Sequence, residues 1–179
     1  MAIEIREARP DEYAEAGRIT ADAYREFSTP GRAGWDEYLV RIADIADRAE
    51  RTTIIVAVER GEVLGTVTLE LEGRTDEGRQ GGSESGPLEP GQAHVRMLGV
   101  APAARGRGVG RLLMEACIEW SRRAGKDLLT LNTTERMKVA RAMYESMGFI
   151  RTPDVVFPDG FVLLAYELPL DGATAAADG

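Results

Sequence analysis

The chain has 179 residues, of which 44% are hydrophobic and 29% are charged. That length fits one domain of ordinary size, and the composition is close to that of an average globular protein, which sets aside disorder, collagen and coiled coil. The single Cys, Cys117, cannot form an internal disulfide, and one Cys with one His cannot build a zinc site of the Cys/His type. We therefore expect no metal site.

The net charge is −8, from 22 basic and 30 acidic residues. General nucleic-acid binders are more often basic. The N-terminus lacks the apolar stretch of a signal peptide, and no apolar run approaches the roughly 20 residues that span a bilayer. We expect a soluble, cytoplasmic protein that binds neither nucleic acid nor a membrane.

The N-terminal half predicts a strand, two helices and a hairpin. Hydrophobic periodicity separates strands from helices, and the pair Arg60-Gly61 between two β-rich runs is typical of a tight hairpin turn. The expected elements are a strand at 3–8, a helix that Pro10, Asp11 and Glu12 open and that runs to residue 27, a second helix at 35–46 and strands at 53–58 and 62–71.

The C-terminal half alternates strands and helices, which indicates an α/β or α+β domain with a mixed sheet. Residues 73–91 are rich in Gly, Ser, Glu and Pro, and we expect a long mobile loop there within a single domain at 1–170. The tail at 171–179 is expected to be disordered. The expected elements are a strand at 93–100, a helix at 108–124, a strand at 127–132, a helix at 135–147 and strands at 149–152 and 161–168.

The most specific local pattern is Arg105-Gly106-Arg107-Gly108-Val109-Gly110, between a predicted strand and a predicted helix. Its glycines permit positive φ and leave backbone N–H groups uncovered. A helix N-terminus favours an anion, and arginines add charge-assisted hydrogen bonds to phosphate. Together with Arg111, the arginines form a small cationic spot on an acidic chain. The pattern indicates a pyrophosphate cradle, with a plain loop carrying solvated arginines as the alternative.

Two other nucleotide-binding motifs do not fit this segment. A Walker loop ends in Gly-Lys-Ser/Thr, which this turn lacks. A Rossmann fingerprint has GxGxxG after the first strand and a ribose-binding acid at the end of the second. Here the spacing is GxGxG after the fourth predicted strand, and the next strand ends at Asn132. Both classes are disfavoured.

The chain resembles the GNAT superfamily of acyl-CoA-dependent N-acetyltransferases. Arg105–Gly110 fits the family's phosphate motif (Q/R)-x-x-G-x-(G/A), and Ala140–Phe149 fits A-x-x-(L/M)-Y-x-x-x-G-F in its last long helix. The two motifs stand in the family's order. The resemblance implies a mixed, largely antiparallel central sheet flanked by helices, with a splayed fourth and fifth strand pair that admits the cofactor.

The resemblance also implies acetyl-CoA as co-substrate. The fourth strand would pair through its backbone with the pantetheine arm, and the glycine turn would hold the phosphates. The residues expected at the cofactor are Met97, Leu98, Gly99, Val100, Arg105, Gly106, Arg107, Gly108, Val109, Gly110, Arg111, Asn132, Ala140 and Tyr144.

The expected reaction is direct attack of a primary amine on the thioester in a ternary complex. By resemblance, the N–H of Leu98 stabilises the oxyanion and Tyr144 protonates the leaving thiolate, with a core Tyr as the alternative for Tyr144. His94 stands where many members carry an acid, and it is the base candidate, with a structural His as the alternative. Glu70 and Glu72, acting through water, are the fallback bases.

The expected acceptor is a small-molecule amine or a peptide or protein, and a homodimer is a further expectation. By resemblance, Tyr24, Trp35 and Tyr38 line the acceptor pocket, with core packing as the alternative. The rival function is a CoA-binding sensor or interaction module without catalysis. His94 in place of an acid and Met137 in place of the Asn that many members carry keep this rival open.

Overall fold

The structure, a computed structural model, describes residues 2–28, 33–72 and 88–170. The expected mobile loop at 73–91 lies largely outside the described residues, and the expected disordered tail at 171–179 lies entirely outside them. The chain forms two compact units, one from 1–69 and 96–117 and the other from 70–95 and 118–179. The expectation of a single domain at 1–170 stays a prediction.

Seven strands form a mixed sheet in the order β1-β2-β3-β4-β5-β7-β6. The β4–β5 pair is parallel, and the pairs β1–β2, β2–β3, β5–β7 and β6–β7 are antiparallel. This largely antiparallel sheet with flanking helices confirms the expected fold class. The strands are β1 (Glu4–Glu7), β2 (Thr53–Glu59), β3 (Glu62–Glu70), β4 (Gln92–Val100), β5 (Leu128–Thr133), β6 (Ile150–Val156) and β7 (Val162–Pro169).

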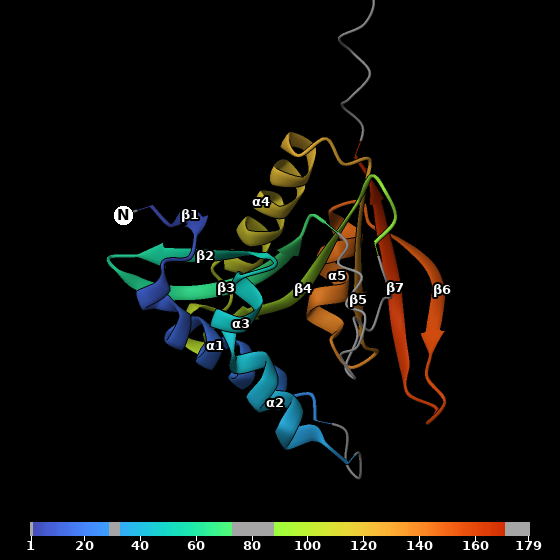
Figure 1. The fold of residues 1–179 in the computed structure, drawn as a ribbon, viewed down its shortest axis with the longest axis horizontal. Helices are drawn as coiled ribbons and strands as arrows, with labels where there is room; N and C mark the ends of the chain where they lie inside the picture. The colour runs from blue at the N-terminus through green and yellow to red at the C-terminus, as the bar shows by residue number, and fades with distance from the viewer. Residues whose placement is uncertain (1, 29–32, 73–87, 171–179) are drawn as a thin grey trace, which may run out of the picture. The chain divides into compact units, whose positions relative to one another are not determined.

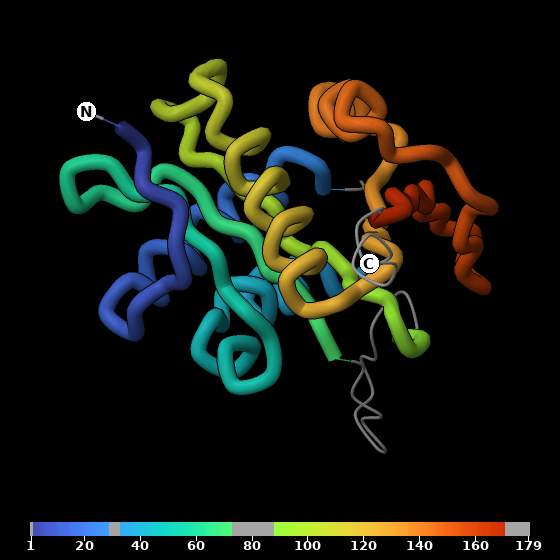
Figure 2. The backbone as a smooth tube through the Cα atoms, turned by 90° about the horizontal axis from the view of Figure 1, so that it is seen from above, coloured from blue at the N-terminus to red at the C-terminus, as the bar shows by residue number. Residues whose placement is uncertain are grey.

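The hairpin between β2 and β3 forms as predicted. Glu59 faces Glu62 across the turn, and the two turn residues both have positive φ, 53° for Arg60 and 83° for Gly61. This is the geometry of a type I′ turn, whose twist suits the flanking strands. Figure 2 shows β1 running alongside β2, and the first unit contains three antiparallel strands in the order β1-β2-β3.

Helices cover both faces of the sheet in the first unit, with α1 (Tyr13–Arg25) on one side and the start of α4 (Val109–Arg123) on the other (Figure 1). Both helices approach the strands at glycines. A Cβ added to Gly99 of β4 would lie 3.3 Å from the Ile19 carbonyl oxygen, and one added to Gly65 of β3 would lie 2.9 Å from Val109 Cγ1. These glycines therefore set how closely the helices pack.

The predicted helix at 35–46 is wrong in its length. The structure has two helices there, α2 (Trp35–Ala43) and α3 (Ile45–Ala49). Asp44 has a ψ of 81°, which breaks the helical path, and its side chain accepts a hydrogen bond of 3.0 Å from the Asp47 N–H. Asp44 therefore caps a new helix, because an Asp side chain satisfies an N–H that the first turn leaves without a partner.

The second unit places α5 (Lys138–Ser146) against β7. The ring of Tyr144 on α5 lies 6.3 Å from that of Tyr166 on β7 and 5.9 Å from that of Phe149. The helix begins later than the predicted 135, because Met137 has a ψ of 57° and stands outside the helical path as its N-cap.

Cys117 is fully buried on α4, which confirms the prediction that it belongs to the core. Burial raises the pKa of its thiol. No helix within the described ranges combines the length and the apolar character needed to cross a membrane.

Candidate functional site

The glycine-rich turn links β4 to α4 in the first unit. A short 3₁₀ helix at Pro102–Ala104 follows β4, and α4 begins at Val109, with the Leu112 N–H donating to the Gly108 carbonyl at 3.0 Å. Gly106 and Gly108 have φ of 75° and 79°, and a Cβ on either would meet nothing within 4 Å. The first N–H groups of α4 have no carbonyl of the preceding turn to bind. The turn thus presents backbone donors beside open space, as the pyrophosphate-cradle prediction requires.

The three arginines expected to bind phosphate contact carboxylates in this structure. Arg105 donates to Glu26 at 2.6 Å, Arg107 donates to Glu59 at 2.9 Å, and Arg111 lies 3.3 Å from Glu115. All three arginine side chains remain 41–49% exposed. Sequence reasoning missed Glu26 and Glu59, because they are 79 and 48 residues away from their partners.

The backbone of β4 is irregular at Met97. Its φ of 54° lies in the left-handed region, which is rare for a non-glycine residue inside a strand. The parallel register with β5 ends just before it, at Val95 opposite Leu131. A left-handed residue interrupts the regular backbone of a strand, and Leu98 directly follows Met97. Met97, Leu98 and Val100 are half-buried, and Gly99 is buried under α1.

His94 lies in the interior of the second unit, with 2% of its surface exposed. Its Nδ1 is 2.7 Å from Thr130 Oγ1 on β5, and Thr130 Oγ1 donates to the Ala93 carbonyl at 3.2 Å. Because the hydroxyl gives its one proton to Ala93, the assigned tautomer has Nδ1 donating to Thr130 and Nε2 as the basic nitrogen.

The remaining expected site residues of the second unit lie on β5 and α5. Asn132 is half-buried on β5 opposite Ala165 of β7, Ala140 is half-buried on α5, and Tyr144 is 6% exposed one turn later. His94, Asn132, Ala140 and Tyr144 thus belong to the second unit, whereas the glycine turn and Met97–Val100 belong to the first.

Sequence reasoning missed a polar network beside Tyr144. The hydroxyl of Tyr166, a residue only 1% exposed, donates to Glu145 at 2.7 Å and accepts from Arg141 Nε at 3.4 Å. The bond to Tyr166 raises the pKa of Arg141 above its usual value. The motif contains Arg141 and Glu145, but nothing local marks Tyr166 as their partner. The network fixes α5, and with it Tyr144, to β7.

Residues 19–149 match the family model described as the acetyltransferase (GNAT) family. The chain therefore belongs to the GNAT acetyltransferase family. No sequence among curated proteins shows significant similarity to it.

Solved structures with the same fold are distant in sequence. The yncA protein of Salmonella typhimurium, whose structure contains its cofactor acetyl-CoA, has a TM-score of 0.66 at 22% identity over 100% of this chain and 99% of that one. A ribosomal-protein-alanine N-acetyltransferase from Brucella melitensis has a TM-score of 0.67 at 24% identity over 93% and 99%. A GNAT acetyltransferase from Staphylococcus aureus has a TM-score of 0.67 at 17% identity over 94% and 99%.

Proposed function

We propose that this acetyltransferase moves the acetyl group of acetyl-CoA to a primary amine of a small molecule or peptide, by direct attack in a ternary complex. The observation that carries the proposal is the turn at the start of α4, where Gly106 and Gly108 hold left-handed conformations beside open space. That backbone fits a pyrophosphate, because its N–H groups and the helix dipole both favour an anion.

The arginines of the turn bind phosphate by exchanging partners. Exposed ion pairs contribute about 0–1 kcal/mol. Arg105 and Arg107 therefore leave Glu26 and Glu59 at little cost when a doubly charged pyrophosphate enters the turn. The carboxylates, in turn, keep the arginines positioned around the turn before the ligand arrives.

Three groups carry the chemical steps in this proposal. The N–H of Leu98, directly after the left-handed residue Met97, stabilises the oxyanion that develops on the thioester carbonyl. Nε2 of His94 takes the proton of the acceptor ammonium, with Glu70 or Glu72 through water as the alternative base. Tyr144 donates the proton that the leaving thiolate needs.

Replacing Tyr144 with Phe tests the acid. The ring contacts with Phe149 and Tyr166 remain, so binding of acetyl-CoA should persist while kcat falls roughly 10²- to 10⁴-fold. Tyr13→Phe is the matched control, because it removes a hydroxyl from a residue packed against the core of the first unit. Equal kcat in Tyr144→Phe and wild type would show that another group protonates the thiolate.

Replacing His94 with Ala tests the base through a pH–rate profile. A missing base costs most near neutral pH, and the defect shrinks at high pH, where the acceptor amine loses its proton unaided. A purely structural His94 would instead give a defect of constant size across pH, because the substitution would only remove the bond to Thr130. A rate defect of constant size would show that His94 is not the base, and Glu70 or Glu72 would then be the candidate.

The burial of His94 favours a second candidate function, a sensor that binds acyl-CoA without turnover. A base must reach the amine, and His94 is only 2% exposed. A sensor would be stabilised by acetyl-CoA and would acetylate none of a broad panel of polyamines, aminoglycosides, amino acids and peptides. Acetylation of any of them at enzymatic rates would exclude it.

A further inference from the structure

Arg48 of α3 is a partly buried cation whose hydrogen-bonding capacity is mostly unused. Its Nε and Nη2 are buried, and neither has a hydrogen-bond partner within the described residues. Its third nitrogen, Nη1, makes one long bond of 3.4 Å to the Asp44 carbonyl. An arginine stays charged at neutral pH, so these buried N–H groups cost free energy unless something else accepts from them.

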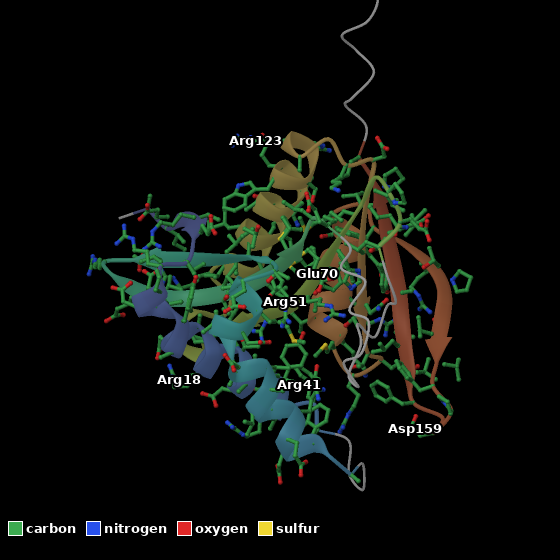
Figure 3. The ribbon with its side chains drawn as sticks, viewed as in Figure 1. Arg18, Arg41, Arg51, Glu70, Arg123 and Asp159 are labelled. Carbon is green, nitrogen blue, oxygen red and sulfur yellow. The ribbon has the colours of Figure 1, made fainter. Side chains whose placement is uncertain are left out.

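The other arginines of this region are satisfied. Arg51 donates to Asp47, and the guanidinium of Arg41 lies over the Tyr38 ring with its carbon 5.4 Å from the ring centre. Figure 3 labels Arg41 on α2 and Arg51 just beyond α3. Arg48 therefore differs from Arg41 and Arg51, because Arg51 has a carboxylate acceptor and Arg41 an aromatic face.

A second unused donor belongs to the same group of helices. The indole Nε1 of Trp35 is buried without a partner among the described residues. The Trp35 ring lies 5.2 Å from Tyr38, and Tyr38 lies 6.5 Å from Tyr24. Both tyrosines lie near Arg48, since their hydroxyls, when ionised, would raise its pKa. The aromatic rings of α1 and α2 and the guanidinium of α3 thus form one cluster, which we call the Arg48 cluster: Tyr24, Trp35, Tyr38 and Arg48.

The cluster adjoins the part of β4 that is expected to hold the acetyl group. Burial lowers the pKa of Arg48, and the positive charge of Arg96 lowers it further. Arg96 directly precedes Met97. An anion beside the two guanidinium groups would remove their repulsion and satisfy the buried donors at once.

We propose that Arg48 and Trp35 bind the carboxylate of the acceptor, so that the acceptor is an amino acid or another amine that carries a carboxylate. Nε and Nη2 form one edge of the planar guanidinium, and two parallel N–H groups match the two oxygens of a carboxylate. Trp35 supplies one further N–H donor, and the aromatic rings supply apolar surface for the rest of the molecule. This inference rests on the proposed amine acetylation.

The test compares acceptors that differ only at the carboxylate. For each amino acid of a panel, initial rates are measured at saturating acetyl-CoA for the free acid, its carboxamide and the decarboxylated amine. The wild type should prefer the free acid of its best substrate by about 10²-fold or more in kcat/KM, because a site built for a charged group rejects an analogue that leaves its donors unpaired.

Arg48→Met should remove that preference, because kcat/KM for the free acid should fall about 10²-fold and much further than kcat/KM for the carboxamide. Arg48→Lys should restore part of the preference, and Trp35→Phe should reduce it. Arg51→Met is the matched control and should keep it, since Arg51 is paired with Asp47. Arg48→Met should also melt no lower than wild type, because it removes a buried charge that lacks partners.

A binding measurement separates failure of this inference from failure of the proposed function. The indole N–H resonance of Trp35 should shift when the free acid is added to the full chain, should not shift with the carboxamide, and should not shift in Arg48→Met. Such a shift without acetylation of any amine would support the carboxylate site and contradict the proposed transferase function.

Three results would overturn the inference itself. One is acetylation with equal or higher kcat/KM for the carboxamides. Another is a preference for the free acid that survives in Arg48→Met. The third is displacement of the free acid by inorganic phosphate at lower concentration than by acetate, which would make the cluster a phosphate site.

Discussion

At the scale of single residues, Glu12 is held firmly in its charged form. It accepts from both terminal nitrogens of Arg6, at 2.8 and 2.6 Å, and from the Arg9 N–H at 2.8 Å. These bonds, with the Arg6 side chain first, lower the pKa of Glu12 from 4.5 to about 2. They tie β1 to the turn that opens α1.

The Glu12 pair predicts a specific loss of stability in acid. A lowered pKa means that the ionised form favours the fold, so the contribution is complete above about pH 4.5 and is lost as the pH falls towards 2. Glu12→Gln should therefore lower the free energy of unfolding at neutral pH by about 2 kcal/mol, allowing for partial exposure. Urea denaturation across this pH range measures it.

The free energy of unfolding of Glu12→Gln should also depend less on pH than that of wild type. The free energy of unfolding of wild type and Glu12→Gln should converge below about pH 2. Glu4→Gln is the control, because Glu4 is 63% exposed and lies 3.5 Å from the same arginine. Parallel curves for wild type and Glu12→Gln at all pH values would contradict the account of this pair.

At the scale of elements, the turn before α4 allows two effects of a substitution at Gly108 to be measured apart: the loss of stability and the loss of cofactor binding. Gly108 and Gly160 have almost the same positive φ, 79° and 84°, and a Cβ on either meets nothing within 4 Å. A β-branched side chain at either position should therefore cost similar stability, because the strain comes from the left-handed conformation alone. Gly160 lies between β6 and β7, outside the phosphate motif.

Only one of the two variants should lose its response to the cofactor. Acetyl-CoA should raise the melting temperature of wild type and of Gly160→Val by linkage, and Gly108→Val should show little or no rise. Differential scanning fluorimetry with and without acetyl-CoA measures the shift. An equal shift in both variants would mean that the pyrophosphate binds elsewhere.

Most elements were predictable because their signals are local. The hairpin at Arg60-Gly61 requires positive φ at both turn positions, and strand alternation around it is visible in the sequence. The helix over 35–46 was predicted as one piece because its apolar spacing continues through Asp44. Hydrophobic periodicity does not reveal a capping residue inside a continuous pattern. The division into α2 and α3 is visible only in the backbone angles and the cap of Asp44.

The candidate site was predictable where a motif carries it and not where it depends on contacts between distant segments. The glycine turn and Tyr144 stand in recognisable sequence patterns. The pairing of Arg107 with Glu59 and the unused donors of Arg48 depend on which segments the fold brings together. No spacing rule in the sequence connects them, and Arg48 resembles any other arginine of an amphipathic helix.

At the scale of the whole molecule, the proposed function is one reaction, the transfer of an acetyl group from acetyl-CoA to an amine. The chain belongs to a family of acetyltransferases, we propose that its turn at α4 binds a pyrophosphate, and Met97 of β4 has a positive φ directly before the N–H proposed for the oxyanion. The acceptor class and the homodimer are separate proposals. Light scattering with the full chain would check the dimer, which should show twice the mass of 19.5 kDa.

The most direct measurement follows an isotope-labelled acetyl group from acetyl-CoA into product by mass spectrometry. The full chain is incubated with labelled acetyl-CoA and a panel of amines that includes amino acids, their carboxamides, polyamines, aminoglycosides and peptides. The account predicts label in the amide of at least one amine, at a rate that Tyr144→Phe lowers and Tyr13→Phe does not. Label found only in acetate, or in no product while acetyl-CoA raises the melting temperature, would contradict it.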